Sequence, residues 1–347
     1  MRAAVYHGPG DVRVDRVPDA RIERPTDALV RVSLAAVCGS DLIFTRGGFY
    51  TEGQRCGHEF LGVVEETGAD VAMLRRGDLV VAPFAWADGD CQHCSQNLHT
   101  SCPAGGVWGL GQASDGGQGE AVRVPFADAT LVRLPNEAAS DPVLLRRLLA
   151  LADVLPTGHH AATRAGVGPG STVAVIGDGA VGLSAVLAAA RLGAERIIVL
   201  GRHPRRLAVA RRFGAADEVT VRGEAAVEAV RELTGGAGVD AAIEAVGSTD
   251  ALNTAIGVVR PGATVGYVGL PHGTDAAPDL GRMFFGNITL RGGIAPVRAY
   301  LPGLLPDVVS GRTDPGPLFD MVARLDDLPA AYRAMAGRSV LKAAIVL

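Results

Sequence analysis

A glycine-rich loop between a short strand and a long helix constrains the fold more than any other part of the chain. Residues 171–177, STVAVIG, have the apolar and β-branched composition of a buried strand, and residues 180–194 follow a helical pattern. Gly177, Gly179 and Gly182 span the junction with the spacing GxGxxG. In this setting the glycines allow a tight turn, close approach of the backbone to a pyrophosphate, and close packing of the helix on the strand. The predicted cofactor contacts at this loop are Gly177, Gly179, Ala180, Val181 and Gly182.

The segments after this loop continue to alternate between strand and helix patterns. The next strand is ERIIVL at residues 195–200, and the alternation runs on to ITLRGGI at residues 288–294. Such alternation is typical of an α/β fold with a doubly wound parallel sheet of the Rossmann type. We place this dinucleotide-binding domain at residues 155–294.

The remaining segments have a different pattern and predict a second domain. Short apolar runs broken by glycine and proline fill the first 150 residues or so, which indicates a strand-rich domain. The last segment, SVLKAAIVL at residues 339–347, predicts a final strand that must return to a sheet. The predicted Rossmann domain is therefore bracketed by two pieces of the other domain, residues 1–154 and 295–347.

Composition excludes several classes of partner. With 347 residues, 48% hydrophobic, and a formal net charge of −4, the chain can bury a large core and has no electrostatic reason to bind nucleic acid or an anionic membrane. Its start is charged from the second residue and lacks an apolar signal region, and charges interrupt its most apolar stretch, residues 173–200. We therefore expect a cytoplasmic protein, where clustered cysteines suggest metal binding more than disulfides.

The segment after the second strand bears on the choice of cofactor. Sites for NAD carry an acid about 20 residues after the glycine loop, which accepts from the ribose 2′-hydroxyl. Here Gly201 takes that place, and Arg202, His203, Arg205 and Arg206 follow it. Guanidinium groups bind phosphate well, and a bound phosphate would offset the unfavourable placement of cations at a helix N-terminus. Gly201, Arg202, His203 and Arg206 therefore predict NADP(H) in preference to NAD(H), unless the arginines are only solvated surface residues.

Metal-binding residue types gather in three places. Cys91, Cys94 and Cys102 lie close together, Cys38 stands in the sequence CGSD, and His58 stands in GHE about twenty residues later. A lone cysteine or histidine is more often a core residue than a ligand. Together with the later glycine loop, and in this order, these motifs resemble the zinc-dependent alcohol dehydrogenases of the medium-chain dehydrogenase/reductase superfamily. The resemblance spans essentially the whole chain and implies that the strand-rich domain is GroES-like.

The resemblance implies a catalytic zinc with one open position, held by a cysteine, a histidine and a third ligand. Cys38 and His58 match the first two ligands. The third ligand lies just before a Thr-Gly pair and is a cysteine in many members and an acid in others, and here that position is Asp153. His159 and His160 are rival ligands, and Asp153 has an alternative role as a helix-capping acid.

The resemblance also assigns roles around this zinc. Asp41 matches the carboxylate that orients the zinc-binding histidine. Glu59 matches an acid beside the metal, with a surface ion pair as its alternative. Ser40 matches the hydroxyl that exchanges a proton with the substrate oxygen while zinc polarises that oxygen. Many relatives continue the proton relay through a histidine, and this chain has Ile43 there, so a water molecule replaces the histidine or the relay stops at Ser40.

The segment that carries Cys91, Cys94 and Cys102, called the cysteine lobe below, matches the structural zinc site of the family. Its four ligands follow one another at intervals of three, three and eight residues, and counting back from Cys91 gives Asp88, where most relatives have a cysteine. The predicted ligands are Asp88, Cys91, Cys94 and Cys102, which together with the catalytic site gives two zinc ions per chain. His93 and His99 are alternative fourth ligands. An empty lobe is a further alternative, because three thiolates and an acid leave a charge of about −2 with Zn²⁺ bound.

Further residues match family positions around the nicotinamide and the substrate. Thr157, Val268 and Leu270 match positions that contact the nicotinamide. Four aromatic residues stand on segments that wall the substrate cleft in the family, which predicts a fairly bulky, apolar substrate: Phe49, Phe84, Trp86 and Trp108.

Three functions are consistent with these motifs. The first is a zinc-dependent, NADP(H)-preferring alcohol dehydrogenase or carbonyl reductase, which Ser40 favours. The second is a biosynthetic reductase that acts on a C=N or conjugated C=C bond, for which Ile43 leaves room. The third is a non-catalytic nucleotide-binding or metal-storage protein, which the combination of ligands with an open metal position argues against. Relatives are dimers or tetramers, so we expect a homodimer or homotetramer acting on a small molecule.

Overall fold

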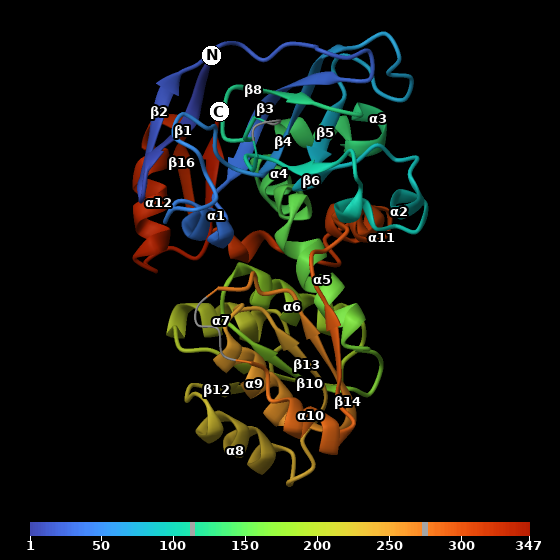
Figure 1. Ribbon diagram of the computed structural model, residues 1–347, viewed down its shortest axis with the longest axis vertical. Helices are drawn as coiled ribbons and strands as arrows, with labels where there is room; N and C mark the ends of the chain where they lie inside the picture. Colours follow the sequence, from blue (N-terminus) through green and yellow to red (C-terminus); the bar gives the residue numbers. More distant parts are fainter. Residues whose placement is uncertain (112–114, 273–276) are drawn as a thin grey trace. The chain divides into compact units, whose positions relative to one another are not determined.

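The computed structural model describes residues 1–111, 115–272 and 277–347 (Figure 1). The chain divides into two compact units. The first unit comprises Met1–Asp153 and Pro296–Leu347, and the second unit comprises Val154–Ala295. Within the described residues, no helix combines the length and the apolar character needed to cross a membrane.

The second unit is built around a parallel sheet of six strands in the order β12-β11-β10-β13-β14-β15. From the central strand β10 the chain first builds outward through β11 and β12, and then returns to build β13, β14 and β15 on the other side. Ligands of doubly wound sheets bind where this direction changes, at the carboxyl ends of the two central strands. The strands are β10 (Thr172–Ile176), β11 (Arg196–Leu200), β12 (Asp217–Val219), β13 (Val239–Glu244), β14 (Val259–Tyr267) and β15 (Thr289–Gly292).

Helices connect these strands and cover the sheet. α5 packs against α6 and β14, and α9 packs against α8 and β13. Apolar side chains of the strands, together with Val227 and Val230 of α8 and Ile256 of α9, form a buried core. The helices are α5 (Val154–Arg164), α6 (Ala180–Arg191), α7 (Pro204–Arg212), α8 (Glu224–Leu233), α9 (Thr249–Val258) and α10 (Leu280–Gly286).

The first unit is rich in short strands. Its largest sheet has seven strands, with the order β16-β17-β3-β4-β5-β9 and with β8 also paired to β3. β1 pairs with β2, and β6 pairs with β7. The strands are β1 (Arg2–Gly8), β2 (Asp11–Arg16), β3 (Ala28–Ala36), β4 (Glu59–Thr67), β5 (Leu79–Ala82), β6 (Ala85–Trp86), β7 (Gly106–Val107), β8 (Ala121–Val124), β9 (Val132–Arg133), β16 (Met321–Arg324) and β17 (Ala343–Val346).

Short helices link the strands of the first unit. They are α1 (Gly39–Phe44), α2 (Gln92–Ser95), α3 (Ala127–Thr130), α4 (Pro142–Leu149), α11 (Val297–Val309) and α12 (Leu328–Ala336), with 3₁₀ turns η1 (His99–Ser101), η2 (Asn136–Ser140), η3 (Ala150–Ala152), η4 (Gly316–Leu318) and η5 (Leu325–Asp327). The predicted return of the C-terminal strand to a sheet is confirmed, because β17 lies antiparallel to β3 with Ala344 opposite Ala36.

Candidate metal and cofactor sites

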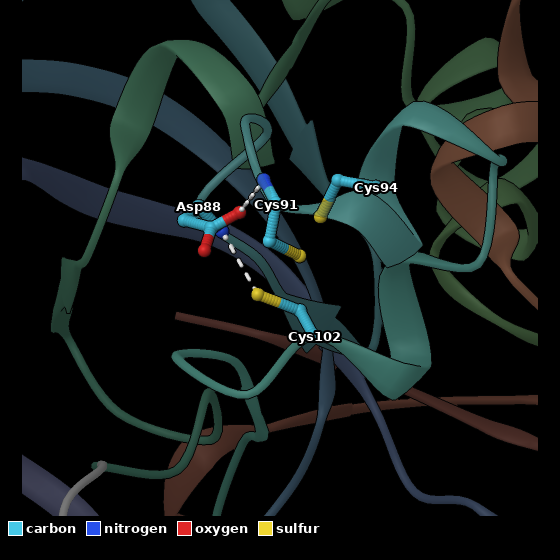
Figure 2. A group of neighbouring side chains, drawn as sticks. All are labelled: Asp88, Cys91, Cys94 and Cys102. Atoms are coloured by element: carbon cyan, nitrogen blue, oxygen red, sulfur yellow. Dashed lines mark hydrogen bonds between the residues drawn. The ribbon is translucent and has the colours of Figure 1, made fainter.

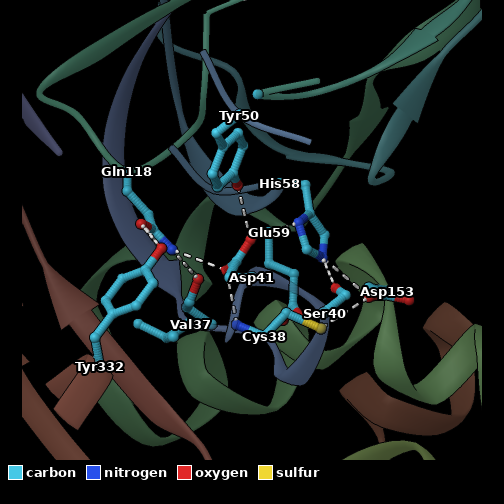
Figure 3. A network of polar contacts seen from close by, with 12 residues as sticks. Val37, Cys38, Ser40, Asp41, Tyr50, His58, Glu59, Gln118, Asp153 and Tyr332 are labelled. Atoms are coloured by element: carbon cyan, nitrogen blue, oxygen red, sulfur yellow. Dashed lines mark hydrogen bonds and ion pairs between the residues drawn. The ribbon is translucent and has the colours of Figure 1, made fainter. Parts of the chain in front are cut away.

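Four buried side chains of the first unit bring potential metal ligands together (Figure 3). The thiol of Cys38, the imidazole of His58 and the carboxylates of Glu59 and Asp153 each offer one ligand atom, and these atoms all lie within 4.8 Å of one another. Asp153 Oδ2 lies 3.5 Å from Cys38 Sγ and 3.4 Å from His58 Nε2. The three residues predicted to hold the catalytic zinc therefore meet in one cluster, with Glu59 as a fourth member.

Strand pairing explains why these residues meet. β3 and β4 are antiparallel neighbours, and Ala36 at the end of β3 is the partner of Glu59 at the start of β4. Cys38 follows Ala36 by two residues in extended backbone, and His58 directly precedes Glu59, so both side chains lie at the same end of this strand pair. Asp153 comes from a separate segment, directly after the turn η3.

Asp41 in the first turn of α1 is completely buried and contacts both ligand segments. Its Oδ2 accepts a hydrogen bond of 2.9 Å from the backbone N–H of Cys38, and its Oδ1 lies 3.0 Å from Nδ1 of His58. The hydroxyl of Tyr50 donates to the same Oδ1 at 3.3 Å. A carboxylate beside Nδ1 favours the tautomer that leaves the lone pair of Nε2 available to a metal.

Gln118, which the sequence did not single out, connects Asp41 to the C-terminal segment (Figure 3). Its Nε2 donates to Asp41 Oδ2 at 3.2 Å and to the carbonyl of Ala36 at 2.9 Å. Its Oε1 accepts a hydrogen bond of 2.8 Å from the hydroxyl of Tyr332. A Cβ atom at Gly57 would lie 2.3 Å from the Gln118 side chain, so only glycine there leaves room for this contact.

Lys342, also missed by the sequence analysis, forms a buried ion pair with Glu59. Its Nζ lies 2.7 Å from Glu59 Oε1 and 3.4 Å from the carbonyl of Val37. The alternative assignment of Glu59 to a surface ion pair is wrong, because both side chains have at most 1% exposure. The other carboxylate oxygen, Oε2, is buried and has no hydrogen-bond partner among the residues that the structure describes.

The electrostatics of the cluster suit a divalent cation. Burial raises the pKa of the Cys38 thiol, and the carboxylates of Glu59 and Asp153 raise it further. Burial lowers the pKa of His58, but Asp41 and Cys38 more than offset this effect, so its pKa is raised. Buried groups of this kind retain protons in the absence of a cation, and zinc would replace them. The orphaned Glu59 Oε2 and the set of thiol, imidazole and carboxylate therefore fit zinc.

Ser40 and Phe84 lie beside the cluster, and Phe44, whose ring centroid is 6.3 Å from that of His58, connects it to Phe49. Ser40 Oγ is 3.4 Å from Nε2 of His58. The ring of Phe84 meets the His58 ring edge-on with 6.3 Å between centroids. Phe49 is half exposed and lies against Phe44, with 5.0 Å between ring centroids.

Both tryptophans lie in the core of the first unit. Trp108 has no exposed surface, packs against Trp86 and Phe60 with ring centroids 4.9 and 5.3 Å away, and donates from Nε1 to the carbonyl of Pro83 at 2.7 Å. A side chain with no accessible surface cannot touch a substrate, so the assignment of Trp108 to the substrate pocket is wrong. Trp86 is 6% exposed, and its assignment stays a prediction.

A second set of ligand atoms gathers in the cysteine lobe (Figure 2). Asp88, Cys91, Cys94 and Cys102 each offer one ligand atom within 4.8 Å of the others, and the three sulfur atoms are turned toward one another. Asp88 Oδ1 accepts a hydrogen bond of 3.1 Å from the backbone N–H of Cys91. This bond holds the pKa of Asp88 below its usual range, while burial raises the pKa of the Cys94 and Cys102 thiols. Four ligands without an open position are typical of structural zinc.

The histidines considered as alternative ligands lie outside both clusters. Among the described residues, His93 and His99 do not join the cysteine cluster, and His159 and His160 do not join the cluster around Cys38. His159 and His160 are buried on α5, and burial lowers the pKa of each to about 4. Both rings are therefore neutral at neutral pH.

The glycine loop lies between β10 and α6 of the second unit. Gly177 has a φ of +119°, and a Cβ atom at Gly182 would lie 2.1 Å from the Gly177 carbonyl oxygen. A Cβ atom at Gly179, the N-cap of α6, would meet nothing within 4 Å. Ala180 and Val181 form the first turn of the helix. The turn and the close packing thus require glycine, and the open space at the N-terminus of α6 suits a pyrophosphate.

The remaining predicted cofactor residues lie on neighbouring segments of the same unit. Gly201, Arg202 and His203 follow β11, and Arg206 stands in the first turns of α7. Thr157 is buried on α5.

Val268 and Leu270 follow β14 at the carboxyl edge of the sheet. The backbone N–H of Val268 donates to the Glu244 carbonyl at 3.0 Å. A Cβ atom at Gly247 would lie 2.0 Å from the Leu270 carbonyl oxygen, so the loops after β13 and β14 pack backbone against backbone.

Comparisons with known proteins agree with this architecture. A model of the alcohol dehydrogenase GroES-like domain matches residues 24–136, and a model of zinc-binding dehydrogenases matches residues 180–310. A probable zinc-binding alcohol dehydrogenase of Mycobacterium tuberculosis is 36% identical over 345 residues, which cover 98% of this chain and 86% of that protein. The glutathione-independent formaldehyde dehydrogenase of Pseudomonas aeruginosa is 35% identical over 95% of this chain and 94% of its own. The solved structure of an alcohol dehydrogenase from Thermus sp. ATN1 has a TM-score of 0.91 and 36% identity, covering 100% of this chain and 99% of that chain.

These matches define an oxidoreductase with a GroES-like part and a Rossmann part, as the fold prediction stated. The chain belongs to the zinc-dependent alcohol dehydrogenase family of the medium-chain dehydrogenase/reductase superfamily. The family predicted from the sequence motifs is therefore confirmed.

Proposed function

We propose that this enzyme transfers hydride between NADP(H) and an alcohol or the corresponding ketone or aldehyde, with a catalytic zinc at Cys38, His58 and Asp153. The observation that carries the proposal is the meeting of these three buried ligands beside the Ser40 hydroxyl. When bound, zinc would polarise the substrate oxygen, and the nicotinamide would supply or accept the hydride. In this assignment Glu59 stays paired with Lys342, so the fourth position of the zinc is left open beside the Ser40 hydroxyl. An open position supports catalysis more than metal storage, which does not need one.

Ser40 is the residue that we assign to proton transfer. Its hydroxyl can both donate and accept a hydrogen bond, so it can give a proton to the substrate oxygen in reduction and receive one in oxidation. Ile43, one turn further along α1, cannot pass that proton on. Because the relay has no protonatable side chain at this position, we propose that a water molecule carries the proton beyond Ser40 or that the relay stops there.

We further propose that the substrate is fairly bulky and apolar. Phe84 lies beside the ligand His58, and the exposed part of Phe49 offers a second aromatic surface. Aromatic side chains supply large apolar contact areas in ligand sites.

The preference for NADP(H) rests on the segment after β11. Position 201 itself carries no acid, and Arg202 and Arg205 are exposed cations beside it that would attract a 2′-phosphate. The groups that would bind the rest of the cofactor are the glycine loop and the N-terminus of α6.

Zinc content tests the two proposed metal sites. We expect about two zinc ions per chain in the wild type and about one in each of Cys38→Ala and Cys91→Ala, measured by elemental analysis. NADPH oxidation with a panel of ketones should be lost in Cys38→Ala on the same samples. Cys56→Ala is the matched control, since Cys56 is buried but belongs to neither cluster.

Other zinc contents would contradict the proposal. A single zinc that disappears only in Cys91→Ala would mean that no zinc binds at Cys38, and would point to a metal-independent reductase or a binding protein. Turnover of imines or conjugated enones, but of no ketone or aldehyde, would identify the alternative reductase.

We propose that the enzyme is a homo-oligomer through the edge of the second unit. Within the described residues β15 has no strand on its outer side, and α10, which precedes it, exposes 78% of Phe284 and 85% of Phe285. Exposed aromatic surface of this kind marks a protein contact.

We expect the double variant Phe284→Ser, Phe285→Ser to lower the molecular mass measured by light scattering after gel filtration. Met73→Ser in the first unit, at a side chain that is 66% exposed, is the control. A monomeric wild type would refute the proposal.

A further inference from the structure

An acid in the glycine loop contacts the segment that follows β11. Asp178 stands between Gly177 and Gly179, and its side chain is almost completely buried. Its Oδ2 accepts hydrogen bonds of 2.7 Å from the backbone N–H of Arg202 and 2.9 Å from that of His203, and lies 2.8 Å from Nδ1 of the His203 ring.

Gly201 makes room for this carboxylate. A Cβ atom at Gly201 would lie 2.6 Å from Asp178 Cβ and 2.9 Å from Asp178 Oδ2. Both distances are shorter than real Cβ contacts, so an acid at position 201 and Asp178 in its present position exclude each other. A carboxylate from the glycine loop therefore lies directly beside position 201, which itself carries none.

The groups around Asp178 are those expected to bind an anion. The two backbone N–H groups lie at the N-terminus of α7, where the helix dipole favours negative charge. Arg206 adds a guanidinium whose Nη1 is 3.8 Å from Asp178 Oδ1. Burial opposes the charge of Asp178, but the hydrogen bonds from His203 and Arg202 outweigh it and lower its pKa. A 2′-phosphate would need the same donors and would meet a negative charge already in place.

We propose that Asp178 is a specificity-determining residue that balances binding of NAD(H) against NADP(H). Its carboxylate can accept from a ribose 2′-hydroxyl, and it repels a 2′-phosphate that the exposed Arg202 and Arg205 attract. The inference deepens the proposed function, since it rests on a nicotinamide cofactor bound at the glycine loop. It makes the preference for NADP(H) a balance of opposing charges that one side chain controls.

Calorimetric titration of the full-length enzyme with 2′,5′-ADP and with 5′-AMP tests this role without turnover. Both nucleotides carry the adenosine end of the cofactor, and only the first has a 2′-phosphate. In Asp178→Asn and Asp178→Ala we expect the Kd for 2′,5′-ADP to fall about tenfold or more, since like charges held close together cost that much or more. The Kd for 5′-AMP should rise or stay unchanged. Glu228→Gln on α8 removes an exposed charge elsewhere in the unit and should change neither value.

A relocation of the acid gives an independent check. Gly201→Asp alone should weaken binding of both nucleotides, because its side chain collides with Asp178. Asp178→Gly combined with Gly201→Asp should restore binding of 5′-AMP while 2′,5′-ADP stays weak. If the combined variant bound 2′,5′-ADP as tightly as Asp178→Ala does, a carboxylate at this place would not repel the 2′-phosphate, and the proposed role of Asp178 would be wrong.

The outcomes separate this inference from the proposed function. If the ratio of the two Kd values in both Asp178 variants stayed within about twofold of the wild-type ratio, only the role of Asp178 would be overturned, and the cofactor site would stand. A wild type that binds neither nucleotide would overturn the cofactor site and this inference together. Loss of zinc or of ketone turnover would leave the nucleotide titrations, and therefore this inference, intact.

Discussion

Lys342→Ala is expected to lower the free energy of unfolding of the first unit by about 3–5 kcal/mol, the usual cost of leaving one charge of a buried pair without its partner. Lys342 is fully buried, with its Nζ 2.7 Å from Glu59 Oε1 and 5.8 Å from the centre of the Phe319 ring. Urea denaturation followed by tryptophan fluorescence measures the effect. Trp86 and Trp108 are the only two tryptophans and both lie in the first unit, so the signal reports that unit.

Removing both charges should be far less damaging. Lys342→Met combined with Glu59→Gln leaves no buried charge uncompensated, and we expect it to recover most of the stability lost by Lys342→Ala. Arg333→Ala on α12 removes an exposed cation and should change the free energy by less than about 0.5 kcal/mol. A Lys342→Ala protein within about 1 kcal/mol of the wild type would show that the pair does not stabilise the fold.

The sequence could predict the ligand clusters because their geometry is set locally or by adjacent strands. Asp88, Cys91, Cys94 and Cys102 lie within one short loop, so spacing along the chain decides which atoms can meet. Cys38 and His58 stand at the ends of two segments that pair as β3 and β4. Asp153 follows no such rule. For Asp153, as for Cys38, His58 and Asp88, the ligand role itself came from the resemblance to the family.

The sequence did not predict residues whose partners are far away along the chain and are brought close by strand pairing. Lys342 reaches Glu59 because β17, β3 and β4 are neighbours, with Ala344 opposite Ala36 and Ala36 opposite Glu59. Residues paired in this way share one face of the sheet, and Lys342 lies two residues before Ala344, on that same face. A signal was present, since a single lysine within the apolar segment SVLKAAIVL requires a buried partner.

For Trp108 and Asp178 the sequence motif gives the position of the residue but not what its side chain contacts. Trp108 stands on a segment that walls the substrate cleft in the family, but its side chain turns into the core against Phe60. Asp178 occupies a position of the GxGxxG motif that any residue can fill, so the motif gives it no role. The combination of an acid in the loop with Gly201 in place of the expected acid was the available signal.

Asp153→Ala is expected to remove the zinc proposed to bind at Cys38, His58 and Asp153. It should lower kcat/KM for ketone reduction by at least about a thousandfold, because the charge stabilisation that such a zinc would supply is worth several kcal/mol. Asp153 Oδ2 lies within 3.5 Å of both Cys38 Sγ and His58 Nε2, so its removal leaves only two of the three proposed ligands. Elemental analysis should find about one zinc ion per chain, that of the cysteine lobe. Glu65→Ala, at an exposed position of β4, should keep both the zinc and the activity.

Asp153→Cys then distinguishes a ligand from a helix-capping acid. A thiolate carries the same charge as the carboxylate and is a softer donor, so this variant should recover the zinc and hold it longer against a chelator than the wild type does. If Asp153 only capped a helix, neither variant would change the zinc content. Both would instead lower stability, because alanine and cysteine are poor caps. Full zinc and full activity in Asp153→Ala would therefore exclude Asp153 as a ligand. In that case Glu59 would be the carboxylate left in the cluster to act as the third zinc ligand. Its Oε2, which has no hydrogen-bond partner among the described residues, would bind the metal.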